Sequence, residues 1–399
     1  MYSASSRFIQ IGVLAIGITA LAILASCNGG DDNNANANGK TVASLRLIGQ
    51  QVLPRRSDYA GTVVGGLSGV DYDEVNNQFL FISDDRTTTD SPNAPRMYTA
   101  RLTYDANTFS AITFTSTFPM KQPDGSVYPK VPDANVADPE SVRIDPVTRN
   151  YLWVSEGDRA LAATPPRVIN PFIREIRPDG THVREYTLPS MFNMSATDIG
   201  PRGNLVFEGI TFTPDKSRVA VITEGSLFQD GPQPTTTTGA VSRITVFDRA
   251  TGVANAQYAY PIDRVQAEPS PAGSFTVNGA TEILALSNTR FLVLERSFSV
   301  GVVGNQVRLY EINVGSATNV LTIASLAGAT YTPVTKRLVL DFDTIRSTVG
   351  NIANLEGITF GPKLANGRES LVVVADDNFP TAESATDRNQ VLVFEVVPQ

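Results

Sequence analysis

The sequence predicts an all-β protein built as a β-propeller, with five four-stranded blades. Runs that alternate apolar and polar residues, bounded by Gly, Pro, Asn and Asp, recur throughout the chain, and no long run has helical periodicity. Five related segments begin at Ser68, Glu140, Glu208, Glu282 and Glu356, at nearly constant spacing. Each segment is followed by enough sequence for four short strands. Repeated four-stranded antiparallel units are typical of a propeller.

Residues 1–26 precede the repeats and predict an export signal. Arg7 is followed by an almost wholly apolar run, and its last letters, LASC, resemble the processing site of a bacterial lipoprotein, in which the cysteine becomes the lipidated first residue. Cys27 is the only cysteine of the chain, so neither a disulfide nor a thiolate metal site is available. An uncleaved transmembrane anchor is the alternative, because about 18–20 apolar residues can span a bilayer. We expect lipidation at Cys27 and a place in the bacterial cell envelope, either periplasmic or on the outer face.

Two further segments follow the export signal. Residues 27–40 are small and polar and predict a disordered tether, and residues 41–399 predict one propeller domain, because no second linker of this kind appears. The net charge of −8 argues against nucleic acid or an anionic membrane surface as the main partner. We therefore expect membrane contact through the lipid anchor, a small-molecule ligand and a monomer.

Four strands are expected in each repeat. The third repeat gives strands at 208–213, 217–224, 241–248 and 254–262, and the second repeat gives four in the same order. The fifth repeat supplies only three before the chain ends. Residues 41–53 are predicted to be its fourth strand, which would close the ring. A poorly marked segment at 331–345 leaves a sixth blade as an alternative.

Acidic residues open the first strand and close the second strand of most repeats. Neighbouring antiparallel strands bring the start of one and the end of the next to the same end of a blade. Because the first strand is innermost, these acids should surround one mouth of the central channel. The candidate metal ligands are Glu140, Glu208, Glu282, Glu356, Asp84, Glu156, Glu224 and Asp376, with Asp85, Glu295 and Asp377 beside them.

The same mouth receives the long connections between blades and between second and third strands, so it is the expected functional face. Clustered carboxylate oxygens select hard cations, Ca²⁺ first and then Mg²⁺ or Mn²⁺. Glu140, Glu208 and Glu356 are the candidate catalytic residues, as ligands or as a base. Arg86, Arg159 and Arg296 follow the second-strand acids and are candidates for binding a phosphate. The structural alternative is that these arginines only neutralise a ring of hydrogen-bonding glutamates.

Other catalytic chemistries lack their residues in this sequence. The single histidine, His182, lies in a turn on the outer side of the second repeat, so no base stands beside a serine nucleophile. No nucleophile elbow, phosphate-binding loop or dinucleotide fingerprint occurs. These absences favour a site made of carboxylates.

Five blocks of sequence, DPESVRID, YLWVSEGD, NLVFEGITFTPD, NLEGITF and LVVVADDNF, resemble the phytase-like family, also described as having esterase-like activity of phytase and found in exported bacterial proteins. The resemblance covers roughly residues 60 to 399. It implies a β-propeller that hydrolyses phosphate or other esters with calcium. Two alternatives stay open: a non-catalytic propeller that binds a ligand or protein, and a lactonase-type hydrolase.

Overall fold

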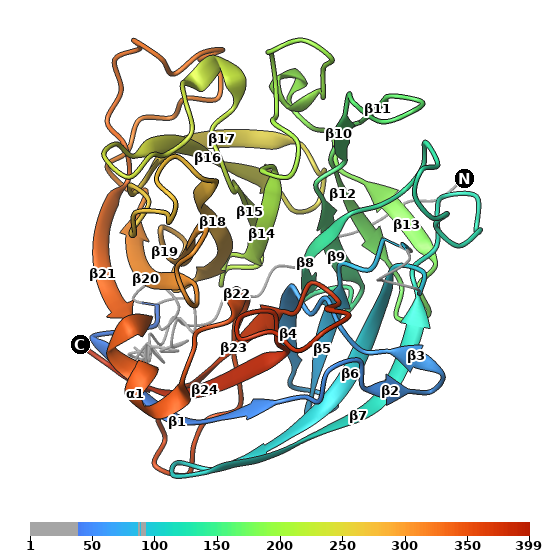
Figure 1. The fold of residues 1–399 in the computed structure, drawn as a ribbon, viewed down its shortest axis with the longest axis vertical. Coiled ribbons are helices and arrows are strands. Elements are labelled where there is room, and N and C mark those ends of the chain that lie inside the picture. Colours follow the sequence, from blue (N-terminus) through green and yellow to red (C-terminus); the bar gives the residue numbers. More distant parts are fainter. Residues whose placement is uncertain (1–38, 87, 89–92) are drawn as a thin grey trace, which may run out of the picture.

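The structure is a computed structural model that describes residues 39–86, 88 and 93–399. Cys27 and nearly all of the expected tether lie outside the described residues. In the described part the chain forms a β-propeller of five four-stranded sheets around a central channel (Figure 1). This confirms the predicted fold class. None of the described helices is long and apolar enough to cross a membrane.

Each blade runs from an innermost to an outermost strand. Blade one is β4 (Gly69–Asp73), β5 (Gln78–Ser83), β6 (Arg96–Tyr104) and β7 (Phe109–Pro119); blade two is β8 (Pro139–Ile144), β9 (Tyr151–Ser155), β12 (Phe172–Ile176) and β13 (His182–Glu185). Blade three is β14 (Phe207–Phe212), β15 (Arg218–Thr223), β16 (Ala240–Asp248) and β17 (Ala254–Ile262); blade four is β18 (Thr276–Ala285), β19 (Arg290–Ser299), β20 (Gln306–Asn313) and β21 (Thr335–Asp341). Blade five is β22 (Asn354–Phe360), β23 (Ser370–Asp376), β24 (Gln390–Val397) and β1 (Ser44–Val52).

The smaller elements lie in the connections. Two hairpins, β2 (Asp58–Tyr59) with β3 (Thr62–Val63) and β10 (Asp158–Ala160) with β11 (Arg167–Ile169), stand outside the blades. A short helix, α1 (Arg346–Val349), precedes β22.

The ring closes by pairing the two ends of the chain, as predicted. β1 runs antiparallel to β24 from Ser44 opposite Val397 to Val52 opposite Gln390, and Figure 1 shows the blue and red strands side by side. The segment 331–345 does not form a sixth blade, because its strand β21 is the outermost strand of blade four.

The repeated phrase EGITF is explained by the contact between neighbouring innermost strands. A Cβ atom on Gly209 would lie 2.5 Å from the amide nitrogen of Ile283, and one on Gly69 would lie 2.8 Å from the carbonyl oxygen of Glu140. A Cβ on Gly357 would lie 2.8 Å from the Ser68 carbonyl oxygen. Only glycine fits where these backbones meet, so the residue after the acid is fixed by packing.

Blades two and four carry side chains at this glycine position, and those side chains fill the waist of the channel. Glu282 is fully buried and accepts hydrogen bonds from Ser141 Oγ (2.9 Å) and the Ile210 amide (3.1 Å), and it forms an ion pair with Arg143 (2.9 Å). The Arg143 guanidinium also donates to the carbonyl oxygens of Val70 (2.7 Å) and Ile358 (3.0 Å). The Arg143–Glu282 pair therefore contacts the innermost strands of all five blades.

Apolar side chains between adjacent blades form the rest of the core. Trp153 is fully buried in β9 and packs edge-on against Phe172, with ring centroids 5.0 Å apart, as expected of a core residue. Most long connections emerge at the end where innermost strands begin. One exception is the 314–334 connection of blade four, which packs along β17 through a bond from the Val320 amide to the Gln257 carbonyl (2.7 Å).

Candidate functional site

Strand register assigns two residues of each blade to the mouth where the innermost strands begin. The first is the residue before the close-packed glycine position, and the second stands two residues beyond the neighbouring-strand residue that lies opposite this position. The first set is Ser68, Glu140, Glu208, Thr281 and Glu356, and the second set is Asp84, Glu156, Glu224, Arg296 and Asp376. The sequence prediction placed most of these residues in the ring.

Blade four departs from that prediction by one residue. Glu282 pairs with Leu294 as Gly209 pairs with Ile222 in blade three, so Thr281 is the counterpart of Glu208. The prediction that Glu282 lies at the mouth is wrong, because it occupies the glycine position at the waist of the channel.

Glu295 is displaced from the mouth for the same reason. Its carboxylate accepts a hydrogen bond from Tyr260 Oη (2.6 Å) and pairs with Lys336, between blades three and four. The residue at the mouth is its neighbour Arg296.

The mouth holds a cavity of about 370 Å³ that is dominated by carboxylates. We call this cavity and the acids behind it the acidic mouth. Glu156 and Glu224 lie behind the residues that line the cavity. They belong to two clusters of three acids, and within each cluster the carboxylate oxygens lie within 4.8 Å of one another. The clusters are Asp138 with Glu140 and Glu156, and Glu156 with Glu208 and Glu224. The charged lining residues are Asp84, Arg86, Asp138, Glu140, Glu208, Arg296, Glu356, Asp376 and Asp387.

Two of the three predicted arginines lie at this mouth. Arg86 forms an ion pair with Asp138 (3.0 Å), and Arg296 pairs with Glu224 (3.0 Å) and Glu356 (3.4 Å). The Nε atoms of both arginines are buried without a hydrogen-bond partner among the described residues. Among the residues that the structure describes, seven lining carboxylates therefore face two guanidinium groups.

Arg159 does not line the cavity, so its predicted placement at the mouth is wrong. It turns toward the connection before β14, where it donates to the Ser195 carbonyl (2.8 Å) and pairs with Asp198 (3.2 Å). Its guanidinium carbon also lies 4.8 Å from the centre of the Phe228 ring. The sequence after β9 did not predict this placement. Arg159 lies in the β10–β11 hairpin, which changes the direction of the chain.

Burial and mutual repulsion raise the pKa of the mouth acids. Burial is the largest cause for Glu208, and the charges of Glu156, Glu224 and Glu356 add to it, so the pKa of Glu208 lies well above its ordinary value. The pKa of Glu140 is raised well above its ordinary value in the same way, by burial and then by Glu208. Burial alone would lower the pKa of Arg296, but the surrounding carboxylates raise it.

Three acids titrate close to neutral pH. Burial raises the pKa of Asp138 to about 6 although Arg86 opposes the shift. Burial and then Asp377 raise the pKa of Asp376 to about 7, and burial with Asp138 and Glu224 raises that of Glu156 to about 8. The acidic mouth therefore holds protons at neutral pH unless another positive charge replaces them.

The residues present could hold a metal ion. Glu156 accepts a hydrogen bond from the Val206 amide through Oε1 (2.6 Å), but its buried Oε2 has no partner within the described part of the chain. Glu156 is also the residue that the two carboxylate clusters share. A donor set made only of carboxylate oxygens suits a hard divalent cation.

Sequence reasoning missed Asp138 and Asn354, which lie at equivalent places in blades two and five. Asn354 donates to Glu356 Oε1 (2.8 Å), and Asp138 binds Arg86. Each stands two residues before a ring glutamate, and residues two apart share a strand face. That spacing, Asp-Pro-Glu and Asn-Leu-Glu, was the available signal.

His182 lies at the opposite end of the molecule from the mouth, as expected. It is the first residue of the edge strand β13 and stands opposite Ile176. Burial lowers the pKa of His182 below its ordinary value.

Comparison with known proteins gives a family. The family model described as "Phytase-like: Esterase-like activity of phytase" matches residues 62–379. No curated protein matches the chain.

Solved structures with a similar chain path include three carbohydrate-related enzymes. An endo-arabinase from Bacteroides thetaiotaomicron shares 10% identity, covers 90% of this chain and 97% of its own, and has a TM-score of 0.38. A putative exo-β-1,3-galactanase from Bifidobacterium bifidum shares 9% identity over 89% of this chain and 94% of its own, with a TM-score of 0.42. An aldose sugar dehydrogenase from Streptomyces coelicolor shares 12% identity over 90% and 100%, with a TM-score of 0.36. Similarity at this level transfers no function.

Proposed function

The chain belongs to the phytase-like family, and from this premise we propose that it is a divalent-cation-dependent ester hydrolase whose site is the acidic mouth. Phosphoesters are the favoured substrates. The family's description, esterase-like activity of phytase, supports this class of reaction.

One observation carries the proposal. Glu140, Glu208 and Glu356 stand at equivalent positions of three innermost strands, and their buried carboxylates face two arginines in one cavity. Several like charges at such short range are stable only when protons or a cation neutralise them. A fold stabilised by hydrogen bonds alone would have no need for this excess of acids.

The residues of the acidic mouth have different proposed roles. The clusters around Glu156 would hold the cation, which when bound supplies Lewis acidity to an ester oxygen or water. Glu140 lines the cavity, and burial followed by the charge of Glu208 raises its pKa well above the ordinary value, so it is the candidate general acid or base. Glu208 and Glu356 complete the ring as further ligands or as the base.

The two arginines favour a phosphoester over an uncharged ester. Arg86 and Arg296 lie in the lining of the same cavity, and each keeps one buried N–H without a partner in the described chain. A planar guanidinium binds phosphate oxygens well and is always charged. An anionic substrate could draw these groups away from Asp138 and Glu356.

Calcium is the expected cation, and hydrolysis with and without chelator is the test. We expect purified protein to hydrolyse p-nitrophenyl phosphate in millimolar calcium and to lose this activity in chelator. Glu208→Gln should abolish the activity. Glu268→Gln is the matched control, because Glu268 is exposed on the connection before β18, away from the cavity lining.

The same assay separates the alternatives. Turnover of a lactone but not of p-nitrophenyl phosphate would favour a lactonase-type hydrolase. Calcium binding by calorimetry without turnover of any phosphoester, carboxylester or lactone would favour a non-catalytic binding propeller. Equal activity of Glu208→Gln and Glu268→Gln would contradict a site at this mouth.

We further propose that lipid at Cys27 anchors the protein in the cell envelope with the mouth turned away from the membrane. The described chain begins beside the opposite end of the channel, where the Lys40 amide donates to the Leu286 carbonyl just after β18 (2.9 Å). The mouth would then stay open to substrate.

A further inference from the structure

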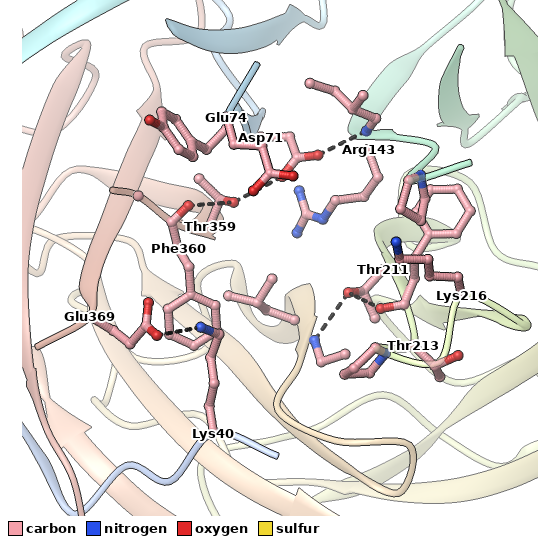
Figure 2. Close-up of a pocket in the computed structure, with 18 of the residues that line it drawn as sticks. Lys40, Asp71, Glu74, Arg143, Thr211, Thr213, Lys216, Thr359, Phe360 and Glu369 are labelled. Atoms are coloured by element: carbon pink, nitrogen blue, oxygen red, sulfur yellow. Dashed lines mark hydrogen bonds and ion pairs between the residues drawn. The ribbon is translucent and has the colours of Figure 1, made fainter. Parts of the chain in front are cut away.

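A second and larger cavity lies at the other end of the channel, where the innermost strands end (Figure 2). Its volume is about 610 Å³, and it shares no lining residue with the acidic mouth. The Arg143–Glu282 pair stands between the two. We call this cavity the second pocket. Its volume is in the range of small-molecule sites.

Aromatic rings from three of the five blades form part of its wall. Tyr72, Phe212 and Phe360 stand three residues after the glycine position of β4, β14 and β22, and each is only partly buried. Leu284 and Ala285 of β18 add apolar surface between them. Such walls suit a ligand with a flat, apolar body.

Arg143 supplies a cationic floor. Figure 2 shows its side chain reaching into the middle of the pocket. Its terminal nitrogens are bonded to carbonyl oxygens and to Glu282, but its Nε is buried and has no partner among the described residues. One N–H of a buried guanidinium is thus left for an acceptor, and an unmet buried donor is costly.

Lys216 supplies a second positive charge at the rim. Its backbone is fixed in a left-handed turn (φ 61°) by bonds from its amide to the Thr213 carbonyl (2.8 Å) and from Arg249 Nε to its own carbonyl (2.8 Å). The side chain is exposed and forms no ion pair within the described chain. Lys40, by contrast, is paired with Glu369 (2.7 Å).

The acids of the second pocket leave the side that carries Arg143 and Lys216 free for an anion. Asp71 already accepts from Thr359 Oγ1 (3.0 Å) and the Ile144 amide (2.8 Å), and Glu369 is held by Lys40. Glu74 lies across the pocket from Lys216 in Figure 2. A negative group would therefore sit between Arg143 and Lys216, away from Glu74.

From these contacts we infer that the second pocket binds a small organic anion, with its charged group between Arg143 and Lys216 and an apolar ring against Phe212 and Phe360. This site does not depend on the acidic mouth or on ester hydrolysis.

The test uses an aromatic anion and its neutral analogue as probes. We expect 1-anilinonaphthalene-8-sulfonate to bind the full chain saturably at one site, measured by fluorescence and calorimetry. Lys216→Glu should weaken binding at least tenfold, and Lys216→Arg should keep it. N-phenyl-1-naphthylamine, which lacks the sulfonate, should bind both variants alike.

Lys130→Glu is the matched control, because Lys130 is an exposed lysine on the long connection before β8 and the charge change is the same. Equal weakening by Lys130→Glu and Lys216→Glu would overturn the inference, as would non-saturable binding. Loss of anion binding in Glu208→Gln but not in Lys216→Glu would also overturn it, because the anion would then sit at the acidic mouth.

Discussion

Replacing Arg143 by methionine removes the cation at the waist of the channel while keeping much of the side-chain volume. Arg143 is 3% exposed and Glu282 is 0% exposed, so the glutamate would lose its only ion-pair partner in the described chain. The carbonyl oxygens of Val70 and Ile358 would lose donors as well. All five blades meet at this pair, so the loss should be felt by the whole ring.

Arg143→Met should lower the free energy of unfolding strongly. Removing one partner of a buried ion pair typically destabilises a protein by about 3–5 kcal/mol, because the other charge is left buried and uncompensated. Native stabilities are about 5–15 kcal/mol, so this is about a fifth of the total or more. Glu282→Gln with Arg143→Met should recover part of the loss, since no buried charge then remains.

Arg143→Met alone should also widen the pH range over which the free energy of unfolding depends on pH. Burial already raises the pKa of Glu282 to about 7, with Arg143 opposing the shift, and without Arg143 the pKa should rise further. A folded-state pKa above the unfolded value means that the folded state binds more protons in the window between them. Through Glu282, both proteins should lose stability as pH rises toward 7, but above about pH 7 only Arg143→Met should go on losing it, by up to about 1.4 kcal/mol per pH unit.

Urea unfolding followed by the fluorescence of Trp153, the only tryptophan, measures both effects. Trp153 is buried in β9, next to the strand that carries Arg143. Arg55→Met is the control, because its pair with Glu383 is exposed and should contribute less than about 1 kcal/mol. An Arg143→Met variant as stable as Arg55→Met, with no extra pH dependence, would refute the argument.

The remaining predictions concern the mouth, the ring closure and the anchor. In chelator, the free energy of unfolding should fall as pH rises from about 5 to 8, because Asp138, Asp376 and Glu156 have folded-state pKa values of about 6, 7 and 8 and lose protons there; calcium should remove most of this fall and raise the melting temperature. Deleting β1 exposes the edge of β24, so a chain starting at Gly61 should aggregate in light scattering; a melting curve equal to that of the whole domain would contradict the closure. Cys27→Ala should shift the protein from the membrane fraction to the soluble fraction, and unchanged fractionation would count against lipidation.

The sequence by itself determined the propeller and its closure. Period-2 alternation and the spacing of five related segments reflect local strand geometry and repetition, which need no knowledge of distant contacts. The missing fourth strand of the last repeat followed from the same reasoning, and β1 occupies that place. The convergence of Glu140, Glu208 and Glu356 also followed, because antiparallel pairing fixes which strand ends lie together.

Tertiary structure alone decided the register of blade four and the contents of the waist. Thr281 and Glu282 are neighbours in the sequence. The alignment of the repeats matched Glu282 to the acids of the other blades, but the register shows that Thr281 is their counterpart. A shift of one residue in a strand moves a side chain to the opposite face. Arg143 looks like any polar residue of a strand, and its partner Glu282 lies in another blade. Sequence could not reveal that pair, because it exists only where five innermost strands meet and three of them carry glycine.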